Sequence, residues 1–177
     1  MISNSYYWKE SLLDCADRLR SYSKTVNLTE KDIVRIEQDI FIRFYSIRKL
    51  MDTVKIKDST RELKIKLSWS PSLKIVNFLN NHKINELYNL SELGSEIRTL
   101  KFLCDQFVHS YIFEIIQEEN IGVSSFYFTS DLDKDKKLFS IDVNDVIDIL
   151  VLVGSDYPSE LNIVRDSSTG SIITKLN

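Results

Sequence analysis

Residues 29–54 read TEKDIVRIEQDIFIRFYSIRKLMDTV, and this stretch decides the fold. Its apolar side chains recur every three or four residues, which predicts an α-helix. Either Asn27 with Glu30 or Thr29 with Asp32 supplies a capping box at its start. Because apolar residues cover almost the whole circumference, we expect this helix to be central and covered on several sides. The main stripe consists of Ile33, Ile36, Ile40, Phe44, Ile47, Met51 and Val54, and Phe41, Ile42 and Tyr45 widen it.

Further helices are predicted on both sides of this one in the sequence. Residues 7–23 carry apolar residues at helical spacing, and residues 92–111 carry a longer stripe of the same kind. We expect the 92–111 helix to pack against the 29–54 helix. Asp142 is expected to cap a last helix over residues 143–153. The side chains predicted to be most buried are Ile36, Ile40, Phe44, Ile47, Leu100, Cys104, Phe107, Ile147 and Leu150.

Strand patterns fill most of the remaining sequence. Apolar and polar residues alternate in RELKIKLSW, residues 61–69, which predicts a half-buried strand with a basic outer face. Lysines on such a face are also typical of an edge strand. Within residues 72–92 the pattern is ambiguous, and we expect a short helix near 73–79 and then a strand near 84–90. Other strands are expected at 112–116, 123–128 and 138–141, and residues 161–165 and 171–176 flank the turn DSSTG as a hairpin.

The order of these elements indicates the fold class. Helices followed by strands are typical of a segregated α+β domain. We therefore predict a single α+β domain over residues 1–177, with a helical N-terminal half and a mainly antiparallel sheet in the C-terminal half. In the helical half, the long 29–54 helix packs with a second long helix, and the sheet half ends in a terminal hairpin.

The composition excludes several classes of protein. The chain has 177 residues, of which 43% are hydrophobic, with four glycines and two prolines. These values exclude disordered and collagen-like chains. Neither GxGxxG nor GKS/GKT occurs, so no glycine-built phosphate loop and no cofactor is predicted. No apolar run approaches the roughly 20 residues of a membrane helix, and the first residues lack a signal-peptide pattern, so we expect a cytoplasmic protein without membrane contact.

No metal site is predicted. Cys15 and Cys104 lie among apolar neighbours and are expected to be buried thiols in a reducing compartment. With two histidines in the chain and no Cys-x-x-Cys pair, a structural zinc site is not expected. Residues 131–135 imitate the start of a calcium loop, but Lys136 occupies the position that requires glycine.

Charge is distributed unevenly along the chain. The net charge is -3, yet residues 48–83 hold nine Lys/Arg against three Asp/Glu, and residues 114–166 hold twelve Asp/Glu against four Lys/Arg. Three interpretations stay open: solvated faces, pairing of the two regions in a dimer, or contact of the basic region with a polyanion such as RNA. Lysines that hold phosphates and a tryptophan that stacks a base would suit single-stranded RNA. The candidate nucleic-acid-binding residues are Lys64, Lys66, Trp69, Arg98 and Lys101.

One pair of residues has the chemistry of a catalytic site. In CDQFVHS, Asp105 and His109 are four residues apart and would be neighbours on a helix face. A carboxylate beside an imidazole favours the charged ring and fixes its orientation. The end of the predicted helix adds a dipole that acts in the same direction. His109 is therefore a candidate acid/base and Asp105 its orienting partner.

The same residues resemble the signature of the HEPN family, a helical group that includes metal-independent ribonucleases. That signature is an arginine, often followed by Asn, Asp or His, with a histidine four to six residues beyond. Asp105 and His109 match its second and last positions, and the resemblance extends to the helical N-terminal half. It implies RNA binding or cleavage with His109 as acid/base. Cys104 stands at the arginine position, so a phosphate-binding charge would have to come from Arg43, Arg48 or a second subunit.

Two functional hypotheses follow. The favoured one is a non-enzymatic cytosolic protein-interaction or regulatory module that binds a protein partner or itself. Its Ile-, Lys- and Asn-rich composition is typical of an accessory protein of a bacterial or mobile-element system. The alternative is a HEPN-like RNA-binding protein or ribonuclease. The missing arginine favours the first hypothesis.

Overall fold

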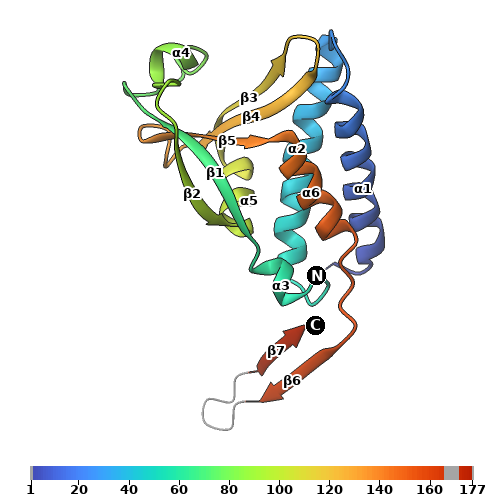
Figure 1. Ribbon diagram of the computed structural model, residues 1–177. Coiled ribbons are helices and arrows are strands. Elements are labelled where there is room, and N and C mark those ends of the chain that lie inside the picture. The colour runs from blue at the N-terminus through green and yellow to red at the C-terminus, as the bar shows by residue number, and fades with distance from the viewer. Residues whose placement is uncertain (1, 166–171, 177) are drawn as a thin grey trace.

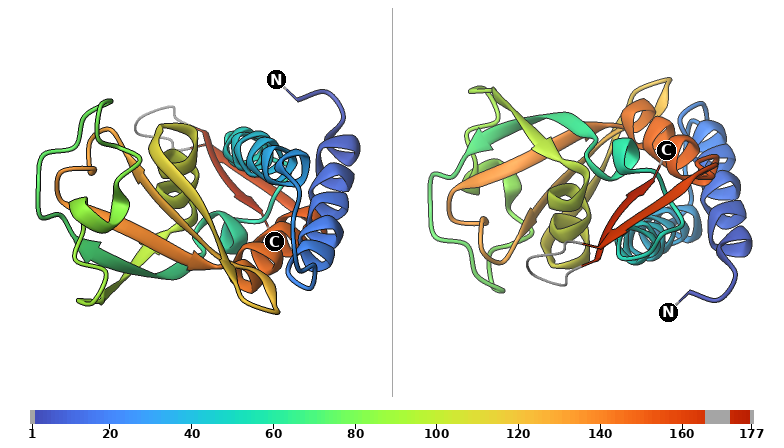
Figure 2. Two further views of the ribbon diagram at one scale, coloured as in Figure 1. Left: turned by 90° about the horizontal axis from the view of Figure 1, so that it is seen from above. Right: turned by 90° about the horizontal axis from the view of Figure 1, so that it is seen from below.

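The computed structural model describes residues 2–165 and 172–176 of the chain. The helices are α1 (Ser5–Tyr22), α2 (Glu30–Met51), α3 (Asp58–Arg61), α4 (Ile84–Leu87), α5 (Leu100–Val108) and α6 (Val143–Gly154). The strands are β1 (Lys64–Pro71), β2 (Gly94–Thr99), β3 (Ser110–Glu118), β4 (Gly122–Ser130), β5 (Lys137–Asp142), β6 (Leu161–Arg165) and β7 (Ile172–Leu176). The helices α1, α2 and α6, with the shorter α5, gather on one side of a twisted sheet, and a small two-stranded sheet lies beyond one end of them (Figures 1 and 2).

The larger sheet has five strands in the order β2-β1-β5-β4-β3, and every neighbouring pair is antiparallel. β6 and β7 form a separate antiparallel pair. Helices together with purely antiparallel described sheets confirm the predicted α+β class, although helices and strands alternate from α3 to β3. β1 lies between β2 and β5, but β5 pairs only with residues 68–71, so the predicted basic strand is internal in its second half and has an open edge at residues 64–67.

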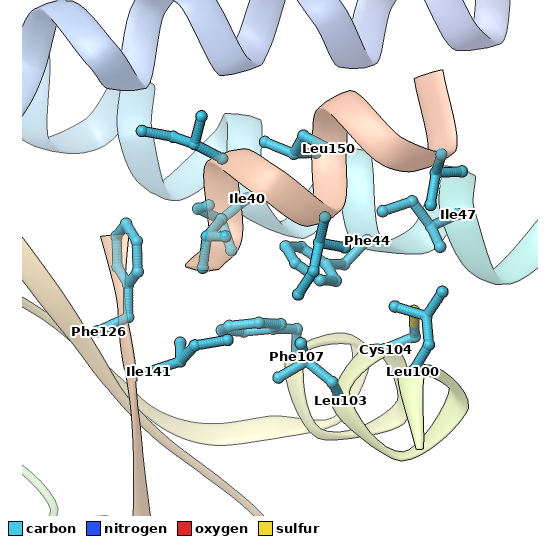
Figure 3. Close-up of a cluster of buried hydrophobic side chains, with 14 of the residues drawn as sticks. Ile40, Phe44, Ile47, Leu100, Leu103, Cys104, Phe107, Phe126, Ile141 and Leu150 are labelled. Atoms are coloured by element: carbon cyan, nitrogen blue, oxygen red, sulfur yellow. The ribbon is translucent and has the colours of Figure 1, made fainter. Parts of the chain in front are cut away.

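A chain of aromatic rings joins α2 to the sheet through α5 (Figure 3). The ring centroid of Phe107 lies 4.5 Å from that of Phe44 on α2 and 4.5 Å from that of Phe128 on β4. The aliphatic side chains around them interlock α1, α2 and α6 with the inner face of the sheet. All nine side chains that the sequence places in the core are buried: Ile36, Ile40, Phe44, Ile47, Leu100, Cys104, Phe107, Ile147 and Leu150.

Side-chain caps fix where the two central helices begin. Thr29 and Asp32 form the capping box of α2, because the Thr29 hydroxyl accepts the Asp32 N–H and the Asp32 carboxylate accepts the Thr29 N–H. This settles the choice left open by the sequence. Asp142 caps α6 as predicted, by accepting the N–H of Asn144 at 2.7 Å.

The predicted helix over residues 92–111 is wrong in its first half. Residues 94–99 form β2, which pairs with residues 64–69 of β1, and α5 starts only after Thr99, whose hydroxyl accepts the Phe102 N–H. Leu93 and Ile97, which suggested a helical stripe, are 69% and 70% exposed. Strand pairing with β1 therefore overrides the local periodicity, and the helix that packs with α2 has nine residues.

The segment between β1 and β2 also differs from expectation. Residues 73–79 form no helix, and residues 84–87 form the short helix α4 in place of a strand. Val76, Leu87 and Tyr88 cover the outer face of the sheet in a small second cluster, so tertiary contacts shape this loop. The predicted terminal hairpin is confirmed for β6 and β7, and its DSSTG turn lies outside the described residues.

Phe44 provides a test of the core. Phe44→Ala removes a fully buried ring between α2 and α5, and we expect the free energy of unfolding to fall by about 3–5 kcal/mol because a cavity remains. Urea denaturation followed by circular dichroism measures the change. Ile42 lies on the same helix and is 53% exposed, so Ile42→Ala is the matched control. It should change the free energy of unfolding by about 0.5 kcal/mol or less. Equal effects of the two variants would contradict this core.

Candidate functional site

His109 lies at the surface, at the C-terminal end of α5. Its backbone N–H donates to the Asp105 carbonyl at 3.0 Å, and its side chain is exposed. The imidazole borders an open cavity of about 470 Å³ between α5 and the loop that connects β4 to β5. The residues that line this cavity are Phe102, Asp105, Gln106, His109, Ser130, Asp131, Leu132 and Asp133.

Asp105 is held by two cations and not by the imidazole. Lys101 Nζ lies 2.5 Å from one carboxylate oxygen, and Arg48 Nε lies 3.1 Å from the other. Partial burial disfavours the charge, but the hydrogen bonds from Lys101 and Arg48 outweigh it and keep the pKa of Asp105 below its usual value. Within the part of the chain that the structure describes, no hydrogen bond or ion pair joins the side chains of Asp105 and His109. The predicted orienting contact is therefore not made.

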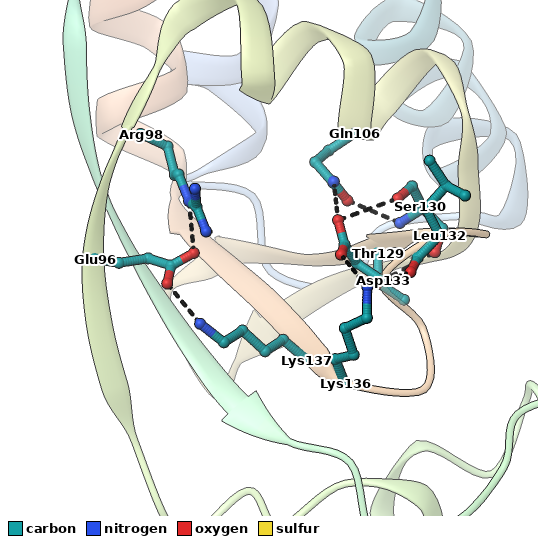
Figure 4. A network of polar contacts seen from close by, with 9 residues as sticks. All are labelled: Glu96, Arg98, Gln106, Thr129, Ser130, Leu132, Asp133, Lys136 and Lys137. Atoms are coloured by element: carbon teal, nitrogen blue, oxygen red, sulfur yellow. Dashed lines mark hydrogen bonds and ion pairs between the residues drawn. The ribbon is translucent and has the colours of Figure 1, made fainter.

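The wall of this cavity is a network of polar side chains (Figure 4). The Gln106 amide donates to Asp133 at 2.7 Å, while the Ser130 N–H donates to the Gln106 oxygen at 2.8 Å. The lining thus contains three carboxylates, those of Asp105, Asp131 and Asp133, and it contains no lysine or arginine. Each of these carboxylates is already paired with a cation: Asp105 with Arg48 and Lys101, Asp131 with Lys134, and Asp133 with Lys136. Among the described residues, the lining therefore offers a phosphodiester no unpaired positive charge.

The other predicted nucleic-acid-binding residues do not form one surface. Arg98 lies on β2, where its Nε contacts Glu96 at 2.7 Å, and Lys101 is bound to Asp105. The Trp69 ring is covered by the Lys137 ammonium, 4.2 Å from its centroid (Figure 4 shows Lys137).

The backbone of Gly94 packs closely against the Trp69 ring as well. It lies opposite Trp69 in the β1–β2 register, and a Cβ atom added there would come within 2.3 Å of the ring. Lys64 and Lys66 remain exposed on the outer face of β1. In the described residues neither ammonium has a carboxylate within 4.0 Å.

A second cavity, of about 530 Å³, lies between β1 and α6. β1 pairs with β2 over residues 64–69 but with β5 only over residues 68–71. Residues 64–67 therefore have a strand on one side only, and α6 stands across from their other side (Figure 1). We call this cavity the β1–α6 groove. It is lined by Leu63, Lys64, Ile65 and Lys66 from the β1 side and by Asp145, Asp148, Ile149, Val151 and Leu152 from α6.

The groove has an apolar floor and walls of opposite charge. Ile65 and Ile149 are buried in the floor, whereas Leu152 is 42% exposed. Burial, together with the neighbouring charges of Asp142 and Asp148, raises the pKa of Asp145. Among the described side chains, no ion pair crosses the groove.

Sequence reasoning singled out the β1 lysines but missed the α6 wall. Asp145, Asp148 and Leu152 recur at three- and four-residue spacing on the predicted 143–153 helix, so they share one face. That signal was available in the sequence. It does not say which strand the face meets, because strand order depends on contacts between distant residues.

Comparison with protein-family models, with curated proteins and with solved structures finds no match to this chain. None of the helices described is both long enough and apolar enough to cross a bilayer. In the same residues, no three His, Cys, Asp or Glu side chains lie close enough to hold a metal ion.

The ion pairs of Asp105 predict a dependence of stability on pH. The pKa of Asp105 is lower in the folded chain than in the unfolded chain, where it is about 3.9. The carboxylate therefore stabilises the fold at pH values above about 3.9, and this contribution disappears as the pH falls through the pKa of the folded state. We expect Asp105→Asn to lower the free energy of unfolding by up to about 1 kcal/mol at pH 6. The difference from wild type should shrink towards pH 3.

Urea denaturation at several pH values between 6 and 3 measures this difference. Glu37→Gln, an exposed carboxylate on α2, is the control and should show no such trend. A difference between Asp105→Asn and wild type that stays constant with pH would show that these ion pairs do not stabilise the fold.

Proposed function

We propose that this chain is a non-enzymatic protein-interaction module that docks its partner in the β1–α6 groove. The observation that carries the proposal is the chemistry of this groove. Its floor is apolar and partly open, its charged walls have no counter-ions in the described residues, and its lining contains no histidine, cysteine or hydroxyl group. Such a surface offers burial and charge pairing to a partner. Its ionisable groups are the β1 lysines and the α6 aspartates, and among the described residues no ion pair joins them into a catalytic pair.

The dimensions of the groove favour a polypeptide. From Asp145 to Leu152, α6 rises about 10 Å at 1.5 Å per residue. This length accommodates about three residues of an extended chain at 3.3 Å each. A small molecule is usually oriented by several converging polar groups in a pocket, whereas here the charges stand on opposite walls above an apolar floor.

The proposal places the module in the cytosol, as an accessory protein of a bacterial or mobile-element system. The two free thiols, Cys15 and Cys104, are buried in the core, which suits a reducing compartment. Burial raises the pKa of both thiols, so neither is a reactive nucleophile.

A HEPN-like ribonuclease is the second candidate, and the exposure of His109 beside a cavity is the observation that favours it. The charge of the cavity weighs against it. Arg48 and Lys101, the cations on the adjacent elements, are already bound to Asp105. A phosphate at His109 would have to compete with this carboxylate for the same cations.

Site-directed photo-crosslinking tests the docking surface. A photoreactive phenylalanine analogue replaces Leu152 in one variant and Lys66 in another, and both proteins are expressed in cells of the source organism. We expect both variants to crosslink the same protein, identified by mass spectrometry. The analogue at Leu93, which is exposed outside the groove, is the control and should not capture that protein. Crosslinking at Leu93 alone would place the partner elsewhere and contradict the proposal.

An RNA-cleavage assay tests the alternative. The wild-type chain, incubated with single-stranded RNA in EDTA, should leave the RNA intact. His109→Ala and His82→Ala form a matched pair, since both remove an exposed histidine. Cleavage by the wild type and by His82→Ala, with loss of activity in His109→Ala, would establish the ribonuclease and overturn the interaction module.

A further inference from the structure

The first half of β1 presents a free strand edge inside the β1–α6 groove. Residues 64–67 bond to β2 on one side, and β5 reaches β1 only from Ser68 onward. Backbone N–H and C=O groups on the open side therefore lack a strand partner. A strand edge beside an open apolar groove is where an extended segment of another protein can add to a sheet.

The helix opposite this edge supplies the second half of a strand-binding site. Lys64 and Lys66 point to the outer face of the sheet, while Ile65 and Leu67 point into the core. A strand added beside β1 would continue this alternation, since successive side chains point to opposite faces. Every second side chain of the added strand would then face α6 and the floor around Ile149.

The charge on the α6 wall selects the partner residue that faces it. Asp145 and Asp148 are exposed and have no cation within 4.0 Å among the described side chains. Asp142 precedes them by one helical turn, so the carboxylates repel one another along this part of α6. A lysine or arginine on the added strand would relieve this repulsion.

We propose that the β1–α6 groove binds an extended segment of a partner protein, which adds as a strand to the free edge of residues 64–67 and directs a basic side chain at Asp145 and Asp148. This inference rests on the proposed function, and it names the form and charge of the partner. Backbone hydrogen bonds to β1 supply affinity, the floor takes apolar side chains, and the α6 carboxylates set the charge preference.

The outer edges of β2 and β3, the two end strands of the five-stranded sheet, are the competing sites for strand addition. Among the described strands, β3 pairs only with β4, and a cavity of about 400 Å³ adjoins it, lined in part by Phe41, Ile42 and Tyr45 of α2. The exposed glutamates of β3, Glu114 and Glu118, lie on the strand itself and form no ion pair among the described side chains. A test therefore has to separate the β1 edge from the outer edges of β2 and β3.

A displayed library of random decapeptides, selected on the full chain, tests the proposal. We expect enrichment of peptides that alternate apolar and polar residues and carry Lys or Arg. Binding should weaken at least tenfold in the double variant Asp145→Asn/Asp148→Asn. Glu37→Gln, which removes an exposed charge from α2, is the matched control and should bind as the wild type does. Circular dichroism checks that all variants are folded.

Two further measurements identify the binding mode. Hydrogen exchange should slow at the alternate amides of residues 64–67 that point away from β2 when the peptide binds, and it should not change at the outer edges of β2 and β3. N-methylation at successive positions of a selected peptide should abolish binding at every second residue, because only alternate N–H groups of an added strand face β1. A helical peptide would lack this period of two.

The outcomes separate this inference from the proposed function. If no peptide is enriched, or if enriched peptides lack basic residues or slow exchange along β2 or β3 in place of residues 64–67, strand addition to β1 is wrong. Crosslinking through Leu152 can still establish the groove as a docking site. If peptides bind and Leu152→Glu leaves their affinity unchanged, the groove is not the site, and both proposals fail.

Discussion

The placement of the Phe107 ring between Phe44 and Phe128 is the contact on which the rest of the structure depends. α5 has nine residues and would not be stable as an isolated helix. It holds its place because its ring packs at 4.5 Å against α2 on one side and against the sheet on the other. α5 also connects β2 directly to β3, the two outer strands of the sheet. Fixing α5 therefore fixes both edges of the sheet relative to the helices.

The β1–α6 groove is a consequence of this arrangement. β5 follows β1 only as far as Ser140 and then leads into α6, which packs against α1. The end of α6 is anchored by the buried Lys9 ammonium, which donates to the carbonyl of Asp156 and, at 2.6 Å, to that of Lys55. Burial lowers the pKa of Lys9, a cost that the two carbonyl acceptors offset. The helical wall of the groove is thus held firmly, while the facing strand edge stays open.

Patterns within single segments of the sequence predicted the elements whose formation depends on residues close together in the chain. The stripe on α2, the alternation in β1 and the cap at Asp142 each lie within one element, and each is found where expected. The segment around Leu93 and Ile97 was predicted to be helical because its apolar residues have helical spacing. Pairing of residues 94–99 with β1 makes it a strand. The predicted contact between Asp105 and His109 is not formed for a similar reason. Their spacing suits a contact, but Arg48, 57 residues away in the sequence, donates a hydrogen bond to the Asp105 carboxylate.

The two cavities differ in what their charges are free to do. At His109 the cations already belong to Asp105, and the carboxylates of the β4–β5 loop are bound to side chains of α5 or of the loop itself. A ligand there must break existing contacts. Among the described residues, the lysines and aspartates of the β1–α6 groove form no ion pair and residues 64–67 have no strand on the open side, so a partner can bind there without breaking contacts within the fold. Unpaired groups around an apolar floor gain more from binding than groups that are already paired, and this difference directs the functional hypothesis from the histidine to the groove.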